Sequence, residues 1–586
     1  MSQVLFYLVA FFSTLSLQAV DTLSVEGYMD SKLTNDSTGL MTVFGQKNGY
    51  ILDPFFYSQN IDGLKLSLTP QFSLSNWYDN VALSKIGRDQ FVVSDSSITS
   101  VNYTYGLDDS HEFFGKYSDK IDDTYLNLIF DRSASVSRFT NSSIKNVGFI
   151  VDLLKTEGKY RFRHGFAKNN FVIEDNGGIS DSTIYISALE LTEYSVPVEL
   201  NSAQNSVNMT DVYLENQVIL NYKEPIDTSS SDSVLSKYNH SLGYNLNLQK
   251  EEYVFSMDQR DIDSAFFDTT AINLAETWDS LGFSKLEYIG YYQLLDTGNR
   301  NLLKVSYNSA RYDWTALNTS SVKAMYDNYR FGRLSLDASY TLSGLWKNGY
   351  AGSVTHDTKI LNSFLSSFKY KIDNNLPGYF YMSYHGNHFD WSNTFKKIQS
   401  NSINYTLYHK PTFTGVEVKV NVLNNWIYMD TLSLPAQLDN QISYVNLSVF
   451  NTLTSKHLNI YSKITYQKAN SEVLRFPSYN FRNVLNYHFK IGRLQLSTGY
   501  AFSYFTSFTG LDYNPNLRKT YLQNSKLVGG IPLLDVFATV RIGEAIIFVK
   551  GENLLFESVS RAYYLYPNRP VLPRYFRVGF SWNFKN

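Results

Sequence analysis

Three basic residues of this chain stand at every second position. Lys159, Arg161 and Arg163 would share one face of an extended segment, and Tyr160 and Phe162 would share the other. A row of cations beside water attracts anionic solutes, which is the functional interpretation of this spacing. The structural alternative, which we favour, is that Asp or Glu residues on neighbouring strands form ion pairs with them, because most charge rows are neutralised or solvated.

Two short clusters contain residue types that bind metal ions: His385, His388 and Asp390, and Asp258, Asp261 and Asp263. The first has no helical spacing to align its ligands, so we interpret it as a strand end or polar loop. The second matches a fragment of a calcium loop, but the spacing and the final Glu of an EF-hand are missing. We therefore expect no metal and no cofactor.

Local enzyme signatures are absent from the sequence. There is no Gly-x-Ser-x-Gly elbow, no P-loop, no His-Glu-x-x-His and no Rossmann fingerprint. The 9 histidines are scattered, and only a catalytic site assembled from several strands would use them. We predict that the protein is not an enzyme. A net charge of -3 provides no basic field for nucleic acid.

The elements that hold these side chains are predicted to be strands. Apolar and often aromatic residues alternate with small or polar ones in residues 333–342, 415–422, 493–504 and 576–584. Each segment runs about ten residues, which is the length of a tilted membrane strand. A dry β-sandwich or propeller also alternates. The aromatic flanks and the small polar opposite flanks favour a barrel with lipid outside and water inside.

The composition agrees with strands that cross a membrane. Aromatic residues make up 16% of the 586 residues, with 46 Tyr and 40 Phe, whereas charged residues make up only 18%. Tyr suits membrane–water interfaces. No apolar run after residue 20 approaches the roughly 20 residues of a membrane helix. Strands in lipid must satisfy their backbone hydrogen bonds by closing into a barrel. There is no cysteine, which excludes disulfides and thiolate chemistry.

The N-terminus has the pattern of a signal peptide. The apolar run Val4–Phe12 is followed by small and polar residues up to Ala19, although no Lys or Arg precedes it. We assign residues 1–19 to a signal peptide and residues 20–95 to a periplasmic or lumenal segment or early strands. Residues 96–586 are predicted to form a transmembrane antiparallel β-barrel without a plug domain.

Turns alternate in length along the predicted barrel. Tight turns centre on Gly332, Gly492 and Gly543, and Asp296–Asn299 and Thr414–Gly415 look comparable. Long polar connections are predicted at 223–237, 427–440 and 505–530. Short turns at one end and long loops at the other are typical of outer-membrane barrels, whose strand number is even. We expect a number near 22, within a range of about 16–26.

Parity along the strands assigns the charged side chains to the lumen. A Lys or Arg that faces lipid costs about 2–4 kcal/mol at the membrane midplane. The residues expected to line the pore are Lys159, Arg161, Arg163, Arg333, Lys419, Arg493 and Arg541.

The C-terminal segment resembles the end of TonB-dependent receptor barrels. The similarity runs from Gly551–Phe556 through Tyr566–Pro570 to Arg574–Phe584. In those families the barrel-insertion machinery reads the terminal aromatic strand. The resemblance therefore implies an outer-membrane insertion signal at Phe576, Val578, Phe580, Trp582 and Phe584. Here two further residues follow Phe584, so the aromatic residue is not terminal.

Three stretches within residues 96–220 carry a family resemblance: Val101–Leu107, the Asn-Gly-Gly-Ile loop in Glu174–Ile179 and the Val-Pro-Val-x-Leu-x-x-Ala segment Val196–Ala203. They are similar to segments of the putative porins of Bacteroidota and related bacteria. The resemblance implies an outer-membrane β-barrel with a porin role. It does not imply a particular substrate.

We therefore expect a porin-like passive diffusion channel for small hydrophilic solutes in the bacterial outer membrane. Its expected partners are the lipid bilayer, the barrel-insertion machinery and the solutes. The alternatives are a structural or assembly barrel of a secretion or surface-attachment system, and a transporter like the TonB-dependent receptors. The latter needs a plug domain longer than the segment that precedes the alternation at Ser97, so we interpret the TonB-box-like Asp21–Val25 as a chance match.

Overall fold

The computed structural model describes most of the chain from Ser96 onward. The described ranges are 96–106, 110–135, 139–187, 196–222, 238–258, 261, 266–296, 301–313, 318–329, 332–361, 363–556, 564–570 and 574–585. The predicted signal peptide at 1–19 and the segment 20–95 lie outside these ranges. The absence of a plug domain therefore stays a prediction. No helix in the described ranges is both long and apolar enough to span a membrane.

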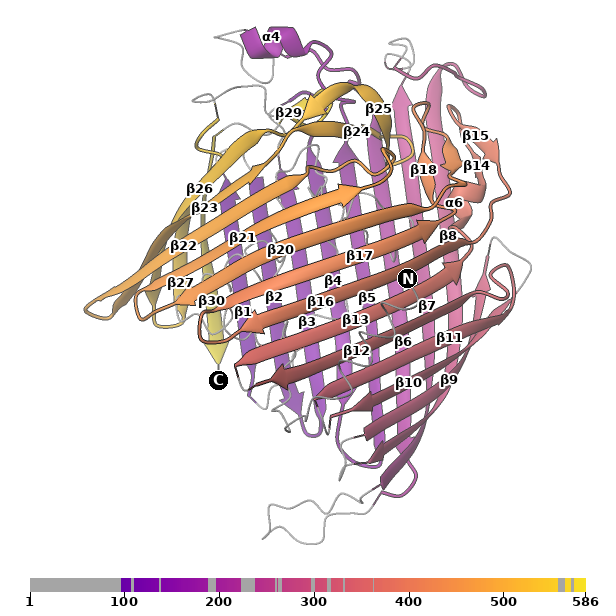
Figure 1. Ribbon diagram of the computed structural model, residues 1–586, viewed down its shortest axis with the longest axis vertical. Coiled ribbons are helices and arrows are strands. Elements are labelled where there is room, and N and C mark those ends of the chain that lie inside the picture. Colours follow the sequence, from indigo (N-terminus) through magenta and orange to yellow (C-terminus); the bar gives the residue numbers. More distant parts are fainter. Residues whose placement is uncertain are drawn as a thin grey trace.

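Twenty-two antiparallel strands form one sheet that closes on itself (Figure 1). The closing pair is β30 with β1, in register from Ile98 opposite Lys585 to Gly106 opposite Arg577. Closure leaves no edge strand with unpaired backbone groups. The predicted fold class and strand number are therefore confirmed. The strands are β1 (Ile98–Gly106), β2 (Ser110–Ile121), β3 (Thr124–Ser135), β4 (Ile144–Lys155), β5 (Tyr160–Glu174), β6 (Gln204–Ile219), β7 (Tyr238–Asp258), β8 (Glu276–Asp296), β9 (Asn301–Tyr312), β10 (Thr319–Asn328), β11 (Arg333–Ser343), β12 (Tyr350–Ile360), β13 (Phe364–Asn375), β16 (Ile398–His409), β17 (Thr414–Asn424), β20 (Ile442–Thr454), β21 (Leu458–Ala469), β22 (Tyr479–Ile491), β23 (Leu494–Phe505), β26 (Ile531–Ile542), β27 (Ala545–Glu552) and β30 (Tyr575–Lys585).

Apolar side chains point outward all around this sheet. In β4, Val147 and Phe149 are 40% and 38% exposed, whereas Asn146 and Ile150 on the other face are each 3% exposed. Similar outward residues occur on strands around the ring, as an apolar belt in contact with lipid requires. They include Phe130, Leu242, Tyr288, Tyr307, Leu336, Tyr340, Val416, Leu447, Ile464, Val536, Ile547, Phe580 and Trp582.

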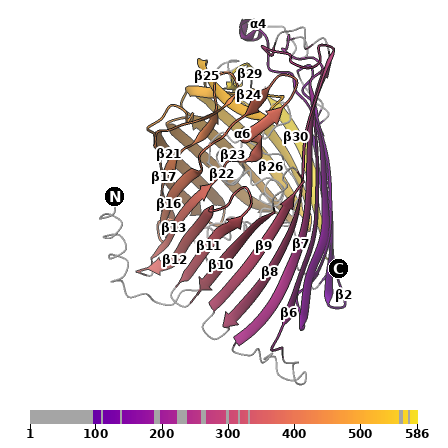
Figure 2. The ribbon, with the colours of Figure 1, turned by 90° about the vertical axis from the view of Figure 1, so that its right-hand side faces the viewer.

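The two ends of the barrel differ. Short turns connect the strands at the end where β1 begins and β30 ends, here called the turn end (Figure 2). Longer segments connect them at the opposite end, here called the loop end, and include the predicted loops 427–440 and 505–530. The connection 223–237 was expected among those loops, but it joins β6 to β7 at the turn end. Thr414 and Gly415 begin β17, so that turn lies just before them.

Several loops at the loop end contain elements of their own. The β5–β6 loop holds the helix α4 (Ser182–Ser187), and the β13–β16 loop holds α6 (Tyr379–Met382). Short hairpins occupy four loops: β14 (Ser383–His385) with β15 (Asp390–Ser392), β18 (Ile427–Met429) with β19 (Pro435–Gln437), β24 (Phe508–Asn514) with β25 (Lys519–Val528), and β28 (Tyr564–Tyr566) with β29 (Arg569–Pro570).

Candidate solute path and the loops across it

Charged residues on the inner wall of the barrel form ion pairs. Arg163 Nη2 lies 2.7 Å from Asp152 Oδ2 on the adjacent strand β4. Glu417 lies 2.9 Å from Lys419 Nζ and 3.3 Å from Lys463 Nζ, the latter on β21. The predicted ion pair with a neighbouring strand is therefore found for Arg163. Lys419, another predicted pore-lining residue, is paired with Glu417 of its own strand.

A chain of ion pairs crosses the seam where β1 meets β30. Lys550 on β27 contacts Asp535 at 3.0 Å and Glu552 at 2.8 Å. Arg577 on β30 contacts Glu552 at 3.5 Å and Glu112 on β2 at 3.3 Å. These charges alternate in sign along the inner wall, so the network cross-links β26, β27, β30 and β2 through side chains where the two ends of the sheet join.

The other predicted pore-lining cations lie toward the turn end. Lys159 immediately precedes β5, Arg333 begins β11, and Arg493 is in the β22–β23 turn. Arg541 is near the end of β26 and lies 3.7 Å from Glu544 in the turn that follows. Arg161, the second residue of β5, is half-buried. Of the seven residues, Arg163 and Lys419 form ion pairs farther along the strands, and the other five, including Arg541 beside Glu544, lie at or near the turn end.

The inner wall is less uniformly polar than the sequence predicts. Phe537, Ile546 and Phe548 on β26 and β27 are at most 5% exposed and alternate with the outward residues Val536 and Ile547. The expectation of small, polar inner flanks is wrong for these strands. The physical reason is that glycines on neighbouring strands leave room for the rings: Phe537 and Phe548 lie against Gly499 and Gly579.

The β24–β25 hairpin crosses the lumen at the loop end. It connects β23 to β26, but its tip contacts β6 and β8, and seven strands (β27, β30 and β1–β5) intervene between β26 and β6. Asn205 Nδ2 on β6 donates to the Pro515 carbonyl at 3.2 Å. Asn516 Nδ2 donates to Asp279 Oδ2 on β8 at 2.7 Å. The hairpin therefore bridges opposite walls of the barrel.

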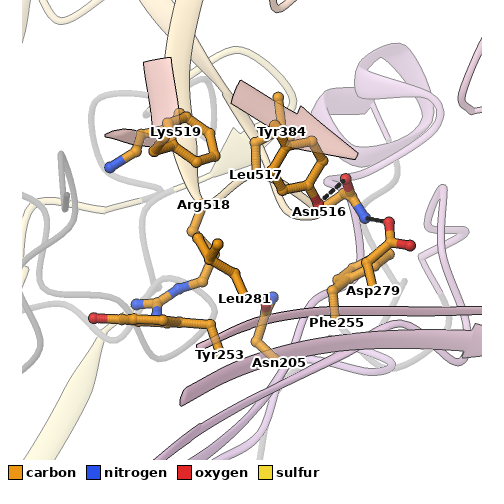
Figure 3. A pocket seen from close by; sticks show the side chains of 11 residues that line it. Asn205, Tyr253, Phe255, Asp279, Leu281, Tyr384, Asn516, Leu517, Arg518 and Lys519 are labelled. Atoms are coloured by element: carbon orange, nitrogen blue, oxygen red, sulfur yellow. Dashed lines mark hydrogen bonds between the residues drawn. The ribbon is translucent and has the colours of Figure 1, made fainter. Parts of the chain in front are cut away.

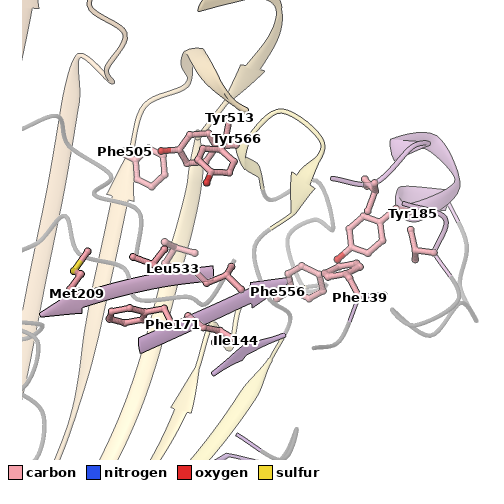
Figure 4. Packing of buried hydrophobic residues seen from close by; sticks show 14 residues of the cluster. Phe139, Ile144, Phe171, Tyr185, Met209, Phe505, Tyr513, Leu533, Phe556 and Tyr566 are labelled. Atoms are coloured by element: carbon pink, nitrogen blue, oxygen red, sulfur yellow. The ribbon is translucent and has the colours of Figure 1, made fainter. Parts of the chain in front are cut away.

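A hydrophobic cluster joins this hairpin to the walls and to the other loops (Figure 4). Phe171 on β5 and Met209 on β6 belong to the same cluster as Phe505 and Leu533 on β23 and β26. Tyr513 of the hairpin is 2% exposed. Because the cluster unites β5–β6 with β23–β26, the lumen is packed with side chains at this level of the loop end. The remaining members are Phe139, Ile144, Ile173, Ile179, Tyr185, Val196, Val207, Phe556 and Tyr566.

The two segments with family resemblance meet here. Asp175, in the loop that contains Asn-Gly-Gly-Ile, lies 3.1 Å from Arg569 Nη2 in the Tyr566–Pro570 segment, and their side chains are 0% and 2% exposed. The Ile179 amide donates to the Asn568 carbonyl at 2.7 Å. Gly178 has a φ of +101°, and a Cβ there would lie 2.9 Å from that carbonyl oxygen. Glycine is therefore required where the loops touch.

Residues of the two clusters that were considered as metal ligands, and for which no metal was expected, take part in this packing. The ring of His388 stacks on Phe267 at 4.3 Å, donates from Nδ1 to the Thr269 carbonyl at 2.7 Å and contacts Thr277 Oγ1 at 2.8 Å. Asp261 accepts hydrogen bonds of 2.6 Å from the Asn201 and Ser202 amides. Asp263 lies outside the described residues. No group of three or more metal-ligating side chains occurs within the described ranges.

A small cavity of about 40 Å³ remains beneath the hairpin tip (Figure 3). The walls contribute Asn205, Tyr253, Phe255, Asp279 and Leu281, and the loops contribute Phe380, Tyr384, Asn516, Leu517, Arg518 and Lys519. Sequence reasoning missed these residues because they come from five separate segments of the chain. The available signal was the run Asn514–Lys519, a turn sequence that ends in two cations inside a long loop.

The sequence matches a known family over nearly its whole length. Residues 12–586 match the model of a family described as "Putative porin". The chain belongs to this family. The assignment and the closed barrel together identify a protein of the bacterial outer membrane, which confirms the predicted localisation and the embedding in lipid. No curated protein matches the chain in sequence.

The solved structures that have a similar fold include outer-membrane receptors and an iron transporter. The ferric enterobactin receptor PfeA of Pseudomonas aeruginosa is 9% identical, with a TM-score of 0.59 over 84% of this chain and 82% of that one. The FrpB iron transporter of Neisseria meningitidis is 10% identical, with a TM-score of 0.56 over 84% and 82%. The siderophore receptor PirA of Acinetobacter baumannii is 9% identical, with a TM-score of 0.59 over 84% and 81%. These likenesses concern the fold.

Proposed function

We propose that this barrel is a porin-like passive diffusion channel for small hydrophilic solutes. The observation that carries the proposal is the paired charge on its inner wall, seen at Arg163 with Asp152 and at Glu417 with two lysines. Such a wall suits a hydrated path whose selectivity depends on charge and on loop constrictions. Diffusion requires no cofactor and no chemical step. Lys159, Arg161, Arg163, Arg333, Lys419, Arg493 and Arg541 are the residues proposed to line the path.

Two further proposals concern orientation and assembly. In outer-membrane barrels the long loops face the cell exterior, so the loop end is proposed to be the outer mouth. The aromatic flank of β30, from Phe576 to Phe584, is proposed as the signal for the barrel-insertion machinery. In support, Phe576, Phe580 and Trp582 point outward and are 46%, 41% and 45% exposed.

Single-channel recording in a planar lipid bilayer tests the channel proposal. The purified full chain should produce stepwise conductance. A silent protein that co-purifies with a stable partner would instead identify an assembly barrel. Conductance that appears only after deletion of residues 20–95 would identify a plugged transporter.

A transporter is the second candidate, and one observation favours it. The β24–β25 hairpin reaches from β23–β26 to β6 and β8 through Pro515 and Asn516, so loops obstruct the lumen at this level. Passage of larger solutes would require those loops to move. Three solved proteins with a similar fold are described as a ferric enterobactin receptor, an iron transporter and a siderophore receptor.

A further inference from the structure

We propose that the cavity beneath the β24–β25 hairpin binds a small oxyanion, a carboxylate or a phosphate, on the guanidinium of Arg518. Arg518 is only 4% exposed and lines the cavity at the hairpin tip. The inference deepens the proposed channel function and rests on it, because it names the class of solute that the path would hold. Binding and conduction are nevertheless measured separately.

Most N–H donors of the Arg518 guanidinium have no acceptor. None of its three nitrogens makes a hydrogen bond of normal geometry within the described part of the chain, although the hydroxyl of the buried Tyr513 lies close enough to interact with one of them. The guanidinium also lies over the ring of Tyr253, whose centroid is 5.1 Å from Cζ (Figure 3). Stacking on a ring uses none of the five N–H groups of a guanidinium. A buried charge that lacks hydrogen bonds is unfavourable, so this site is suited to an anion.

The one carboxylate among the residues that line the cavity forms no ion pair with Arg518. This carboxylate, Asp279, already accepts hydrogen bonds from the Asn387 amide at 2.8 Å and from Asn516 Nδ2 at 2.7 Å. Lys519 adds a second positive charge, with Nζ 5.3 Å from the Phe380 ring. Aromatic walls of low polarity strengthen the field of both cations. The local potential therefore favours an anion.

The size of the site restricts the ligand. A cavity of about 40 Å³ has room for about three water molecules, so it suits a small oxyanion rather than a sugar or a siderophore. A guanidinium binds both classes of oxyanion with paired hydrogen bonds. The anion would lie between the hairpin and the β6–β8 wall. Its binding would strengthen the contact between them.

Calorimetric titration of the full-length protein in detergent tests the proposal. Inorganic phosphate and sodium acetate are titrated separately, in low-salt buffer that contains chloride. We expect saturable binding of at least one of the two anions. The titration that shows binding identifies the ligand class as phosphate or carboxylate. R518Q should weaken binding at least tenfold. R518K, which keeps the charge but loses the paired geometry, should weaken it several-fold.

Two further variants control the test. K396Q removes a loop cation whose side chain is 70% exposed to solvent. This variant should bind the anion as the wild type does. L281F fills the cavity and should reduce binding while Arg518 is kept, which covers the case that R518Q fails to fold. Folding is checked by heat-modifiable migration in gels.

The proposal is overturned if the wild type shows no saturable binding of either anion, or if R518Q and L281F bind as the wild type does. Loss of binding in K396Q would also overturn it. Binding without conductance would contradict the channel proposal alone, whereas conductance without binding would contradict only the anion site.

Discussion

At the scale of single residues, glycines on the inner wall make room for aromatic rings on neighbouring strands. A Cβ at Gly165 would lie 2.3 Å from Cζ and Oη of Tyr213, whose side chain is 0% exposed. Gly415 stands in the same relation to the ring of Phe450, at 2.1 Å. Because a buried ring has no free space to move into, these positions tolerate no side chain.

We predict that G165V destabilises the barrel by about 1–3 kcal/mol, because it overpacks a filled site. The free energy of unfolding in urea, measured in lipid vesicles, checks this. G290V is the matched control on another strand, since a Cβ at Gly290 meets nothing within 4 Å. Equal stability of both variants would contradict the prediction.

The buried pair of Asp175 and Arg569 gives a second prediction at this scale. R569M leaves a carboxylate buried without its cation, which costs about 3–5 kcal/mol when such pairs are broken. Without this ion pair the segment Tyr566–Pro570 should be held less firmly. We therefore expect faster hydrogen exchange at the Ile179 amide, which donates to the Asn568 carbonyl of that segment. The double variant D175N/R569M should lose less than the sum of the single changes. Additive losses would show that the two residues do not interact.

At the scale of elements, the loops are held by side chains from other loops and from the strands. The β14–β15 hairpin is attached to the β7–β8 loop and to β8 through His388. Its Nδ1–H donates to the Thr269 carbonyl, so the neutral ring accepts from Thr277 Oγ1 at Nε2. Burial lowers the pKa of His388 below its usual range, although the Thr269 carbonyl and Asp279 act in the opposite direction.

This geometry predicts that acid loosens the hairpin. A group whose folded pKa is lowered contributes stability that is complete above its unfolded pKa, about 6.5 for His, and is lost as pH falls through the folded value. The protection factor of the Ala271 amide, which donates to the Asn387 carbonyl, should therefore fall in mild acid once the exchange rate is corrected for the intrinsic effect of pH. H388Q should abolish this dependence. H385Q should keep it, since the His385–Asp390 pair is about 69% and 68% exposed.

The β24–β25 hairpin reaches across the lumen to β6 and β8, so we expect it to narrow the proposed path. Replacing residues 508–528 by a short Gly-Ser linker removes its contacts with β6 and β8, and we expect a larger single-channel conductance. Replacing the β18–β19 hairpin, residues 427–437, is the control and should change conductance less. Unchanged conductance after removal of residues 508–528 would show that the hairpin does not limit flow.

At the scale of the whole molecule, stability in lipid depends on which face of each strand a residue occupies. On β11, Leu336 faces outward and is 36% exposed, whereas its neighbour Ser335 faces inward, opposite Asp327 and Thr355. L336R places a charge in the apolar belt and should cost about 2–4 kcal/mol near the midplane. S335R places the same charge on the inner wall and should cost less. Unfolding in vesicles compares the two, and an equal loss would contradict the assigned faces.

The sequence by itself determined that the chain forms a barrel and which side chains of its strands face lipid. Alternation of period two is a local property, so Phe580 and Ser581 could be assigned to opposite faces without knowing any partner strand. The short turns were predicted from Gly-centred breaks in the alternation, and the even strand number from the count of candidate strands and the rule for outer-membrane barrels. The family resemblance of segments at both ends of the barrel sequence predicted that the protein lies in the outer membrane.

Only the tertiary structure decided what lies across the lumen. Asp175 and Arg569 are 394 positions apart, and Asn205 and Pro515 are 310 apart, so no local pattern links them. Loops carry no periodicity, and their contacts form only once closure brings β5–β6 to face β23–β26. For the same reason Arg518 reads as an ordinary loop cation in the sequence, and only its burial beside Tyr253 makes it a candidate anion site.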